Sequence, residues 1–124
     1  MALQFIRESA NDFTITGYEA GSVRVGAATF TESISLSHSS AARVWAASQP
    51  LDAASVAAGA TLDAEIVIIG SGNKLVFPKP ESLRPLIEAR IGYEIMDSRA
   101  ACRTYNVLLA EGRKVGLLLR LEKI

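Results

Sequence analysis

Several residue types are scarce in this 124-residue chain, and each scarcity excludes a class of protein. Cys102 is the only cysteine, so the chain can form neither an internal disulfide nor a thiol-based metal cluster. His38 is the only histidine, and no group of His, Asp and Glu has the spacing of metal ligands. We therefore expect neither a metal site nor a cofactor.

The chain also lacks an excess of charge and a long apolar run. Its 13 basic and 13 acidic residues cancel and no Lys/Arg cluster occurs, which argues against nucleic acid or an anionic membrane surface as partner. The longest apolar runs, such as residues 115–119, have the length of a strand, so we expect no membrane insertion. Residues 1–13 resemble neither a secretory signal nor a mitochondrial presequence, which favours a cytoplasmic protein.

What the chain does contain is enough apolar material for one core. Hydrophobic residues make up 49% and charged residues 21% of the sequence, a composition typical of folded globular proteins. The length suits one domain, and no internal repeat or linker divides it. We therefore expect residues 1–124 to form a single domain.

The first third of the chain has the pattern of half-buried strands. Apolar residues alternate with polar ones around residues 13–16, 23–25, 28–30 and 34–36, which predicts an antiparallel meander. A short helix follows, with Asp52 as N-cap and Gly59 just past its end. Trp45, between these parts, is expected to anchor the core.

The second half alternates strands and helices. Residues 65–69 form an apolar, β-branched run that favours a strand covered on both faces. A helix is expected from Ser82 to about Arg90, ended by Gly92, then a strand over residues 93–96, a helix over residues 98–110 and a last strand over residues 115–121. This order predicts an α/β fold with three layers: a mixed central β-sheet, helices on one side and an N-terminal antiparallel β layer. The direction of the last strand stays open.

The helix over residues 98–110 separates its side chains by polarity. Ala101, Cys102, Tyr105, Leu108 and Leu109 share a core-facing stripe, while Arg99, Arg103 and Asn106 lie on the other side. A polar face of this kind is normal for a surface helix and requires no function.

A ligand-binding interpretation of the same region depends on location. Ligands of open sheets with parallel strands favour the crevice beyond the strands' carboxyl ends, where a helix N-terminus attracts anions. This predicts an anion or small-molecule site between the loop after residue 69 and the start of the Ser98 helix, made by Gly70, Ser71, Gly72, Asn73, Ser98, Arg103 and Asn106. Asp97 argues against it, because a carboxylate at the cap would occupy the same N–H donors.

Catalytic signatures are weak. The Gly70-Ser71-Gly72 loop matches neither a dinucleotide-binding fingerprint nor a P-loop, and a tight exit from a buried strand explains its glycines equally well. Cys102 beside Arg103 could be a nucleophile, but it lies on the core stripe, and His38 is a distant base. We identify no catalytic residue.

The segment of residues 96–115, with the sequence MDSRAACRTYNVLLAEGRKV, resembles the signature of a small family of uncharacterised bacterial and archaeal domains. This family is related to a mitochondrial assembly factor of respiratory complex I. Trp45, residues 68–72 and Pro78 occur upstream in the expected order, whereas Ser71 and Ser98 stand where threonine is more usual. The resemblance implies a three-layer arrangement around a mixed sheet and supplies no activity.

Two functional hypotheses follow. The first is a non-catalytic accessory or assembly-type protein that binds another protein; the second is a small-molecule or anion-binding domain, possibly an enzyme, that uses the crevice. The first is favoured, because the family resemblance supports it and no catalytic constellation is found. The partner, the ligand and the oligomeric state stay open.

Overall fold

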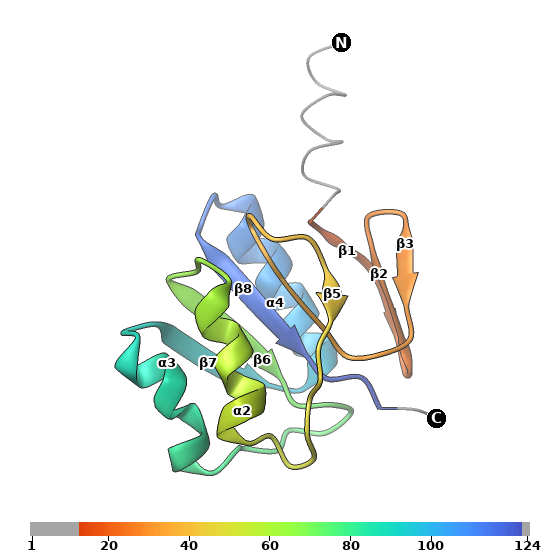
Figure 1. Ribbon diagram of the computed structural model, residues 1–124. Coiled ribbons are helices and arrows are strands. Elements are labelled where there is room, and N and C mark those ends of the chain that lie inside the picture. Colours follow the sequence, from red (N-terminus) through yellow and green to blue (C-terminus); the bar gives the residue numbers. More distant parts are fainter. Residues whose placement is uncertain (1–12, 123–124) are drawn as a thin grey trace.

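A computed structural model of the protein describes residues 13–122, in which the strands form two separate sheets (Figure 1). The smaller sheet is antiparallel and contains β1 (Ile15–Glu19), β2 (Ser22–Val25) and β3 (Ala28–Phe30). The larger sheet has the order β5-β4-β8-β6-β7. Its strands are β4 (Ile34–Ser37), β5 (Arg43–Val44), β6 (Ile66–Gly70), β7 (Gly92–Met96) and β8 (Val115–Leu119).

The centre of the larger sheet is the parallel pair of β6 and β8. Ile68 of β6 stands opposite Leu117 of β8, and both side chains are fully buried. Val67 and Ile69, which alternate with Ile68, belong to a different hydrophobic cluster and are equally buried. The apolar run of β6 is therefore covered on both faces, as its composition predicted.

One face of this sheet is covered by α4 (Ser98–Ala110) together with the smaller sheet. Ala101 and Tyr105 of α4 are fully buried in the same cluster as Ile68. The Tyr105 hydroxyl donates a hydrogen bond of 2.8 Å to the carbonyl of Phe13. The amphipathic helix expected over residues 98–110 is thus present, and its apolar stripe faces the core.

A second polar contact joins α4 to β1. The Asn106 side chain accepts a hydrogen bond from the Ile15 backbone N–H at 2.9 Å and donates one to the Ile15 carbonyl at 2.8 Å. This pair of bonds is the one that a neighbouring strand would make with the edge of a sheet. Asn106 therefore extends the hydrogen bonding of β1 onto the helix and fixes the smaller sheet against α4.

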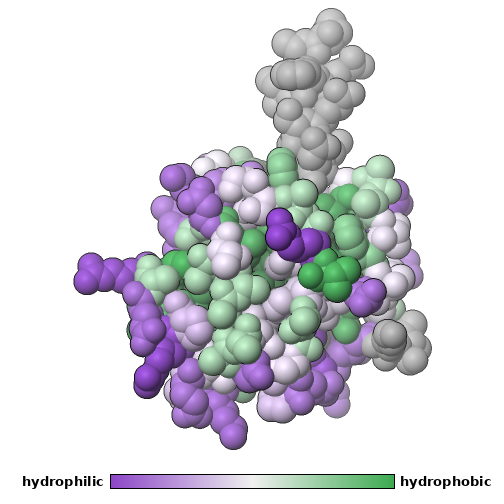
Figure 2. Space-filling model, viewed as in Figure 1, coloured by the Kyte–Doolittle hydropathy of each residue, from purple (hydrophilic) through white to green (hydrophobic). Residues whose placement is uncertain are grey.

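The opposite face is covered by short helices. They are α2 (Ala53–Val56) and α3 (Arg84–Glu88), each next to a 3₁₀ turn, at Ala57–Thr61 and Pro80–Leu83. In Figure 1 they lie in front of the sheet, with α4 behind it. In the same view, the surface over α2 is mostly pale, and hydrophilic residues gather toward the left and lower edges (Figure 2).

Trp45 joins these short helices to the sheet. Its ring is buried in one cluster with Val56, Leu86 and Ile69, and its indole N–H donates a hydrogen bond of 2.8 Å to the carbonyl of Ser55. A buried tryptophan needs an acceptor for this N–H, and the end of α2 supplies it.

The α/β class, the mixed sheet and the N-terminal antiparallel layer are therefore confirmed. The helices, expected on one side, are divided between the two faces: α4 shares its face with the smaller sheet, and α2 and α3 cover the other. The reason is that β6 and β8 are apolar on both faces and each face needs a cover. The direction of the last strand, left open by the sequence, is parallel to β6.

The meander expected in the first third ends one strand early. β4 does not continue the smaller sheet but pairs with β8, where Ile34 stands opposite Leu119. All four residues of β4 are buried, which is incompatible with the wet face of a meander. Its serines are short enough to be accommodated inside.

Helix boundaries also differ from expectation. Asp52 does cap α2, since its carboxylate accepts the Ser55 N–H at 2.9 Å, but the helix has only four residues before it tightens at Ala57. Ser82 lies inside a 3₁₀ turn and caps nothing. A left-handed residue, Arg90 with φ of 60°, stands between α3 and β7 in place of the expected Gly92.

We predict that Asn106→Ala destabilises the protein by about 1–3 kcal/mol, because it leaves the N–H and carbonyl of Ile15 without their partners. Chemical unfolding followed by circular dichroism measures the change. Arg103→Ala, in the same helix and on an exposed side chain, is the matched control and should change stability by less than about 0.5 kcal/mol. Equal effects of the two changes would contradict this role of Asn106.

Candidate ligand-binding site

The loop that follows β6 is held by the serine at its start. Ser71 is buried, and its N–H donates to the carbonyl of Met96 at the end of β7, at 2.9 Å. Its hydroxyl donates to the Lys74 carbonyl at 2.7 Å and accepts from the Val76 N–H at 2.9 Å. One side chain therefore fixes the loop between residues 71 and 76.

The space directly between Gly70 and Ser98 is filled, but a hollow of about 370 Å³ lies beside it, lined by Gly72 and Asn73 of the loop, by Asp97 and Arg99 at the start of α4, and by Tyr18 and Ala20. Ser98 is fully buried, and its hydroxyl accepts the Gly72 N–H at 2.9 Å and donates to the Arg120 carbonyl at 2.6 Å. A Cβ atom on Gly70 would lie 2.9 Å from the Ser98 hydroxyl and 3.0 Å from its Cα. The loop thus packs directly on the helix, and no space for a ligand remains between Gly70 and Ser98.

The N-terminal donors of α4 are occupied as well. The Ser98 N–H donates to the Gly72 carbonyl at 2.8 Å, and the Ala100 N–H donates to the Asp97 carboxylate at 2.9 Å. Asp97 is the N-cap that the sequence suggested. The objection raised by its carboxylate therefore applies, and these donors do not face a bound anion.

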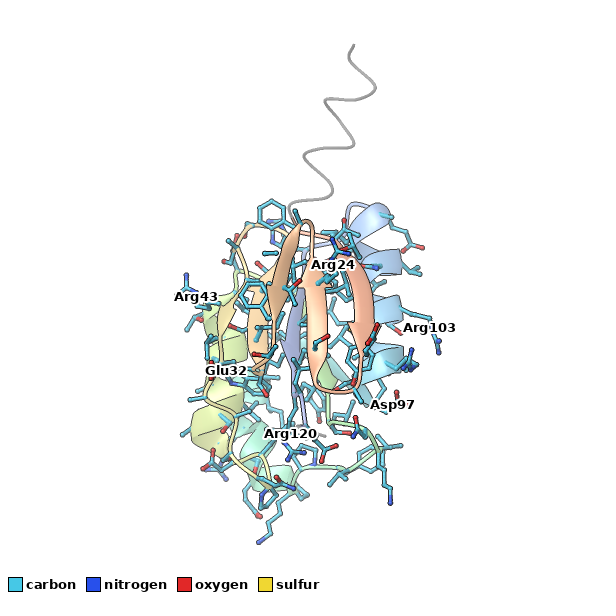
Figure 3. The ribbon with its side chains drawn as sticks, turned by 90° about the vertical axis from the view of Figure 1, so that its right-hand side faces the viewer. Arg24, Glu32, Arg43, Asp97, Arg103 and Arg120 are labelled. Atoms are coloured by element: carbon cyan, nitrogen blue, oxygen red, sulfur yellow. The ribbon has the colours of Figure 1, made fainter. Side chains whose placement is uncertain are left out.

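The seven residues expected to form the site divide into two groups. Gly70, Ser71, Gly72, Asn73 and Ser98 do meet at the junction of the loop with α4, as the contacts above show. Arg103 and Asn106 lie farther along α4, where they line a hollow of about 230 Å³ beside β1. Asn106 is committed to Ile15, and Arg103 points outward from the helix (Figure 3).

A larger hollow, of about 440 Å³, lies on another side of the same loop. We call it the Arg120 hollow. Its lining residues come from the segment before α2, from the loop after β6 and from the end of the chain: Gln49, Pro50, Leu51, Ser71, Asn73, Lys74, Val76, Pro78, Arg120 and Glu122. Ser71 and Asn73 belong to the expected site, whereas the other lining residues do not.

Arg120 is the most buried charge of this hollow, since only 12% of its side chain is exposed. Its backbone N–H donates to the Gly70 carbonyl at 3.0 Å, which continues the pairing of β8 with β6 by one residue. Its Nη1 donates to the Ser71 carbonyl at 3.1 Å. Figure 3 shows the side chain beyond the lower ends of the strands, at the edge where the loop crosses.

Glu122 completes the polar part of the hollow. One carboxylate oxygen accepts the Asn73 N–H at 2.5 Å, and the other lies 3.6 Å from Nη1 of Arg120. Gly72, with φ of 117°, passes so close to this pair that a Cβ there would lie 2.6 Å from the Glu122 carboxylate. The positive φ of Gly72 favours glycine at this position, and a larger residue would also displace the Glu122 carboxylate.

Sequence reasoning missed Arg120, although a signal was present. It is the one charged residue between Val115 and Leu121, in a run that is otherwise apolar or glycine. A lone arginine at the carboxyl end of a strand that is buried on both faces has to reach a polar partner or a cavity.

Cys102 has no activated thiol. It is buried on the core stripe, and burial raises the pKa of its thiol to about 12, against a small opposite effect of the nearby Arg99. His38, which would have to act as its base, bonds to the carbonyl of Asp63 at 2.9 Å, and its backbone N–H bonds to Val115 at the start of β8. The arrangement gives Cys102 a packing role.

Two features are absent from the described part of the chain, residues 13–122. No group of three or more His, Cys, Asp or Glu side chains there is placed to hold a metal ion. No helix in that range is long and apolar enough to cross a membrane.

Comparison with known proteins identifies the family. A family model described as "Protein of unknown function (DUF498/DUF598)" matches residues 15–120. The chain belongs to this family. An uncharacterized protein of Rhodobacter capsulatus is 33% identical over 111 residues, which are 89% of this chain and 86% of that protein.

Similar proteins include a bacterial protein of known structure and a longer mammalian protein. A crystal structure of a protein from Bordetella parapertussis superposes with a TM-score of 0.81 at 32% identity, over 88% of this chain and 95% of that one. The mouse protein named NADH dehydrogenase [ubiquinone] 1 alpha subcomplex assembly factor 3 is 40% identical over 55 residues. Those residues are 44% of this chain and 30% of the mouse protein, so the match spans less than a third of that relative. The resemblance noted in the sequence is thereby confirmed.

We predict that Gly70→Ala destabilises the protein by about 1–3 kcal/mol, because the added methyl group would press on the backbone of Ser98 and on Leu119. Gly17→Ala is the matched control, since its methyl group would meet only the Arg24 side chain at 3.6 Å. Urea unfolding of both variants measures the difference. If Gly70→Ala were as stable as Gly17→Ala, the loop could not be packed on α4 as closely as described.

We also predict that the Cys102 thiol is inert in the native protein. A pKa near 12 in place of 9.0 leaves about a thousandfold less thiolate at pH 8, so labelling by a disulfide reagent should be slow until the protein is unfolded. Because the folded pKa is raised, the associated stability is complete below pH 9 and is lost as the pH rises toward 12. Rapid labelling of the folded chain at pH 8 would refute the buried placement.

Proposed function

We propose that this protein is a non-catalytic accessory protein that binds another protein through the apolar loop, defined as Leu75, Val76 and Phe77. The supporting observation is exposure: these three consecutive side chains are 51%, 52% and 69% exposed. Large apolar side chains that gather on a surface mark contact sites more often than isolated ones do. The described residues include six large apolar side chains that are exposed, and half of them are in this loop.

The apolar loop is fixed to the body of the protein from both ends. Ser71 accepts the N–H of Val76, and Pro78, just after the loop, is buried. A loop held in this way presents its side chains without a large further loss of conformational entropy on binding. The fixed position of the apolar loop therefore favours binding of another protein over a purely structural role in covering the core.

The name of the mouse relative agrees with an accessory role. The mouse relative is named as an assembly factor, and an assembly factor acts by contact with other proteins. That name describes a longer protein, so its partner is not assigned to this chain. The absence of an activated nucleophile at Cys102 and of a metal-binding group within residues 13–122 leaves the binding role as the better supported one.

Two further expectations from the sequence are kept as part of this proposal. The chain acts as one domain, in which the two clusters of core residues share β6 and β8. It works in the cytoplasm, which suits a lone buried cysteine with no disulfide partner.

We predict that Phe77→Ser weakens binding of the natural partner by at least about tenfold, as loss of a central aromatic contact often does. Tagged wild-type protein and variants, expressed in the native cells, are purified and their bound proteins quantified by mass spectrometry. The partner candidate is then prepared pure, and its affinity for each variant is measured by calorimetry.

Val107→Ser is the matched control, because Val107 is 55% exposed but lies on α4, away from the apolar loop. It should bind the partner as the wild type does. If Phe77→Ser and Val107→Ser recover the same proteins with the same affinity, the apolar loop is not the contact. Concentration-dependent self-association lost only in Phe77→Ser would replace the partner by a second copy of this chain.

A further inference from the structure

The Arg120 hollow has unused hydrogen-bond donors. A guanidinium carries five N–H groups, and within residues 13–122 one contact, from Nη1 to the Ser71 carbonyl, is made at hydrogen-bond distance. No side-chain nitrogen in this range is both fully buried and without a partner. The guanidinium nitrogens of Arg120 that lack a protein partner are therefore in contact with solvent, on a side chain that lines the hollow.

The charges of the hollow leave an excess of one positive charge. Lys74 and Arg120 are positive and Glu122 is the one negative residue among the lining side chains. Glu122 forms an ion pair with Arg120 at 3.6 Å and also accepts the Asn73 N–H, so the second positive charge of the lining, that of Lys74, has no negative partner among the lining residues. A single negative charge on a ligand would restore balance.

Four of the seven uncharged lining residues are apolar. Pro50 and Leu51 form one side, Val76 and Pro78 come from the loop after β6, and Leu51 and Pro78 are buried. A volume of about 440 Å³ lies within the range of small-ligand sites, which are mainly apolar with few polar groups that fix orientation. A ligand here would carry an apolar group next to its charge.

We propose that the Arg120 hollow binds a carboxylate that is attached to a branched or aromatic apolar group. The planar fork of a guanidinium matches the two oxygens of a carboxylate, and the excess of one charge suits a monoanion better than a phosphate dianion. Such a ligand has two sources, a free small carboxylic acid or the C-terminal residue of a peptide. The site shares Ser71 and Asn73 with the one expected from the sequence, but Arg120 takes the place of Arg103.

The test is a titration of ¹⁵N-labelled full-length protein with N-acetyl-leucine and with N-acetyl-leucinamide, followed by NMR. The acid, at up to about 10 mM, should shift the Arg120 Nε–H signal and the amide signals of Asn73 and Leu51 in a saturable way, as a site with Kd near 1 mM does. The amide has the same apolar group without the charge and should bind at least about tenfold more weakly. Equal shifts by both compounds, or none by either, would overturn the proposal.

Variants locate the site. Arg120→Gln should abolish the difference between acid and amide, and Arg84→Gln, an exposed arginine outside the lining, should preserve it. If Arg120→Gln does not fold, the comparison of the acid with the amide on the wild-type chain still tests whether the carboxylate is recognised. Lys74→Gln then serves as the second variant and should weaken binding of the acid several-fold, because it removes the other positive charge.

A third probe distinguishes a free carboxylic acid from the C-terminus of a peptide as the ligand. It is an acetylated pentapeptide that ends in leucine with a free carboxylate. Tighter binding of this peptide than of N-acetyl-leucine assigns the hollow to a chain terminus, and equal binding assigns it to small acids. Phe77→Ser should leave the binding of N-acetyl-leucine unchanged, because Phe77 does not line the hollow. A failure of this proposal is thereby distinguished from a failure of the apolar loop as a protein contact.

Discussion

The structure depends on the burial of β6 and β8 on both of their faces. These two strands are parallel, and almost every side chain of the pair is in one of two separate hydrophobic clusters. Two-sided burial requires a cover on each side, which explains why α4 with the smaller sheet lies on one face and the short helices lie on the other. Burial of the 13 and 10 residues of these two clusters contributes the largest favourable term to folding.

The same constraint determines where polar groups gather. Interior strands have no room for charge, so the chain's polar contacts at this end begin where the strands stop, at Gly70 of β6, Met96 of β7 and Leu119 of β8. Ser98 connects these ends, since its hydroxyl and N–H bond to Gly72 and Arg120. The general rule that ligands favour the carboxyl ends of parallel strands points to this same edge of the sheet. At this edge, hollows lie on both sides of the loop, one next to the start of α4 and one next to Arg120.

The sequence was informative where period and burial decide the outcome. The apolar run of β6 and the stripe of α4 follow from alternation and from helical spacing, and both are confirmed. The sequence was uninformative where the choice of partner strand depends on residues far away in the chain. β4 has the alternating pattern of a meander strand, but it pairs with β8, about 80 residues later. The local sequence pattern does not predict which strand β4 pairs with, because the stabilising contacts come from a strand that is distant in the sequence.

The candidate site shows the same limit at the level of single residues. Asn106 was assigned to a ligand because it lies on the polar face of α4, yet its amide bonds to the backbone of Ile15, 91 residues earlier. Arg120 was passed over because it reads as the end of a strand. The two side chains differ in their partners. Asn106 bonds to both the N–H and the carbonyl of Ile15, whereas Arg120 bonds to the Ser71 carbonyl, pairs with Glu122 and lines a hollow.

The two proposed surfaces are connected through one loop. Val76 is exposed as part of the apolar loop and also lines the Arg120 hollow, and Ser71 bonds to the N–H of Val76 while its carbonyl accepts from Arg120. A carboxylate on Arg120 would therefore contact the support of the loop that a protein partner would cover. Since any coupling between two sites is reciprocal, a ligand that changes the affinity for the partner is itself bound with a changed affinity in the complex. The loop after β6 thus belongs to both proposed surfaces, and Ser71 is hydrogen-bonded to a residue of each, Val76 and Arg120.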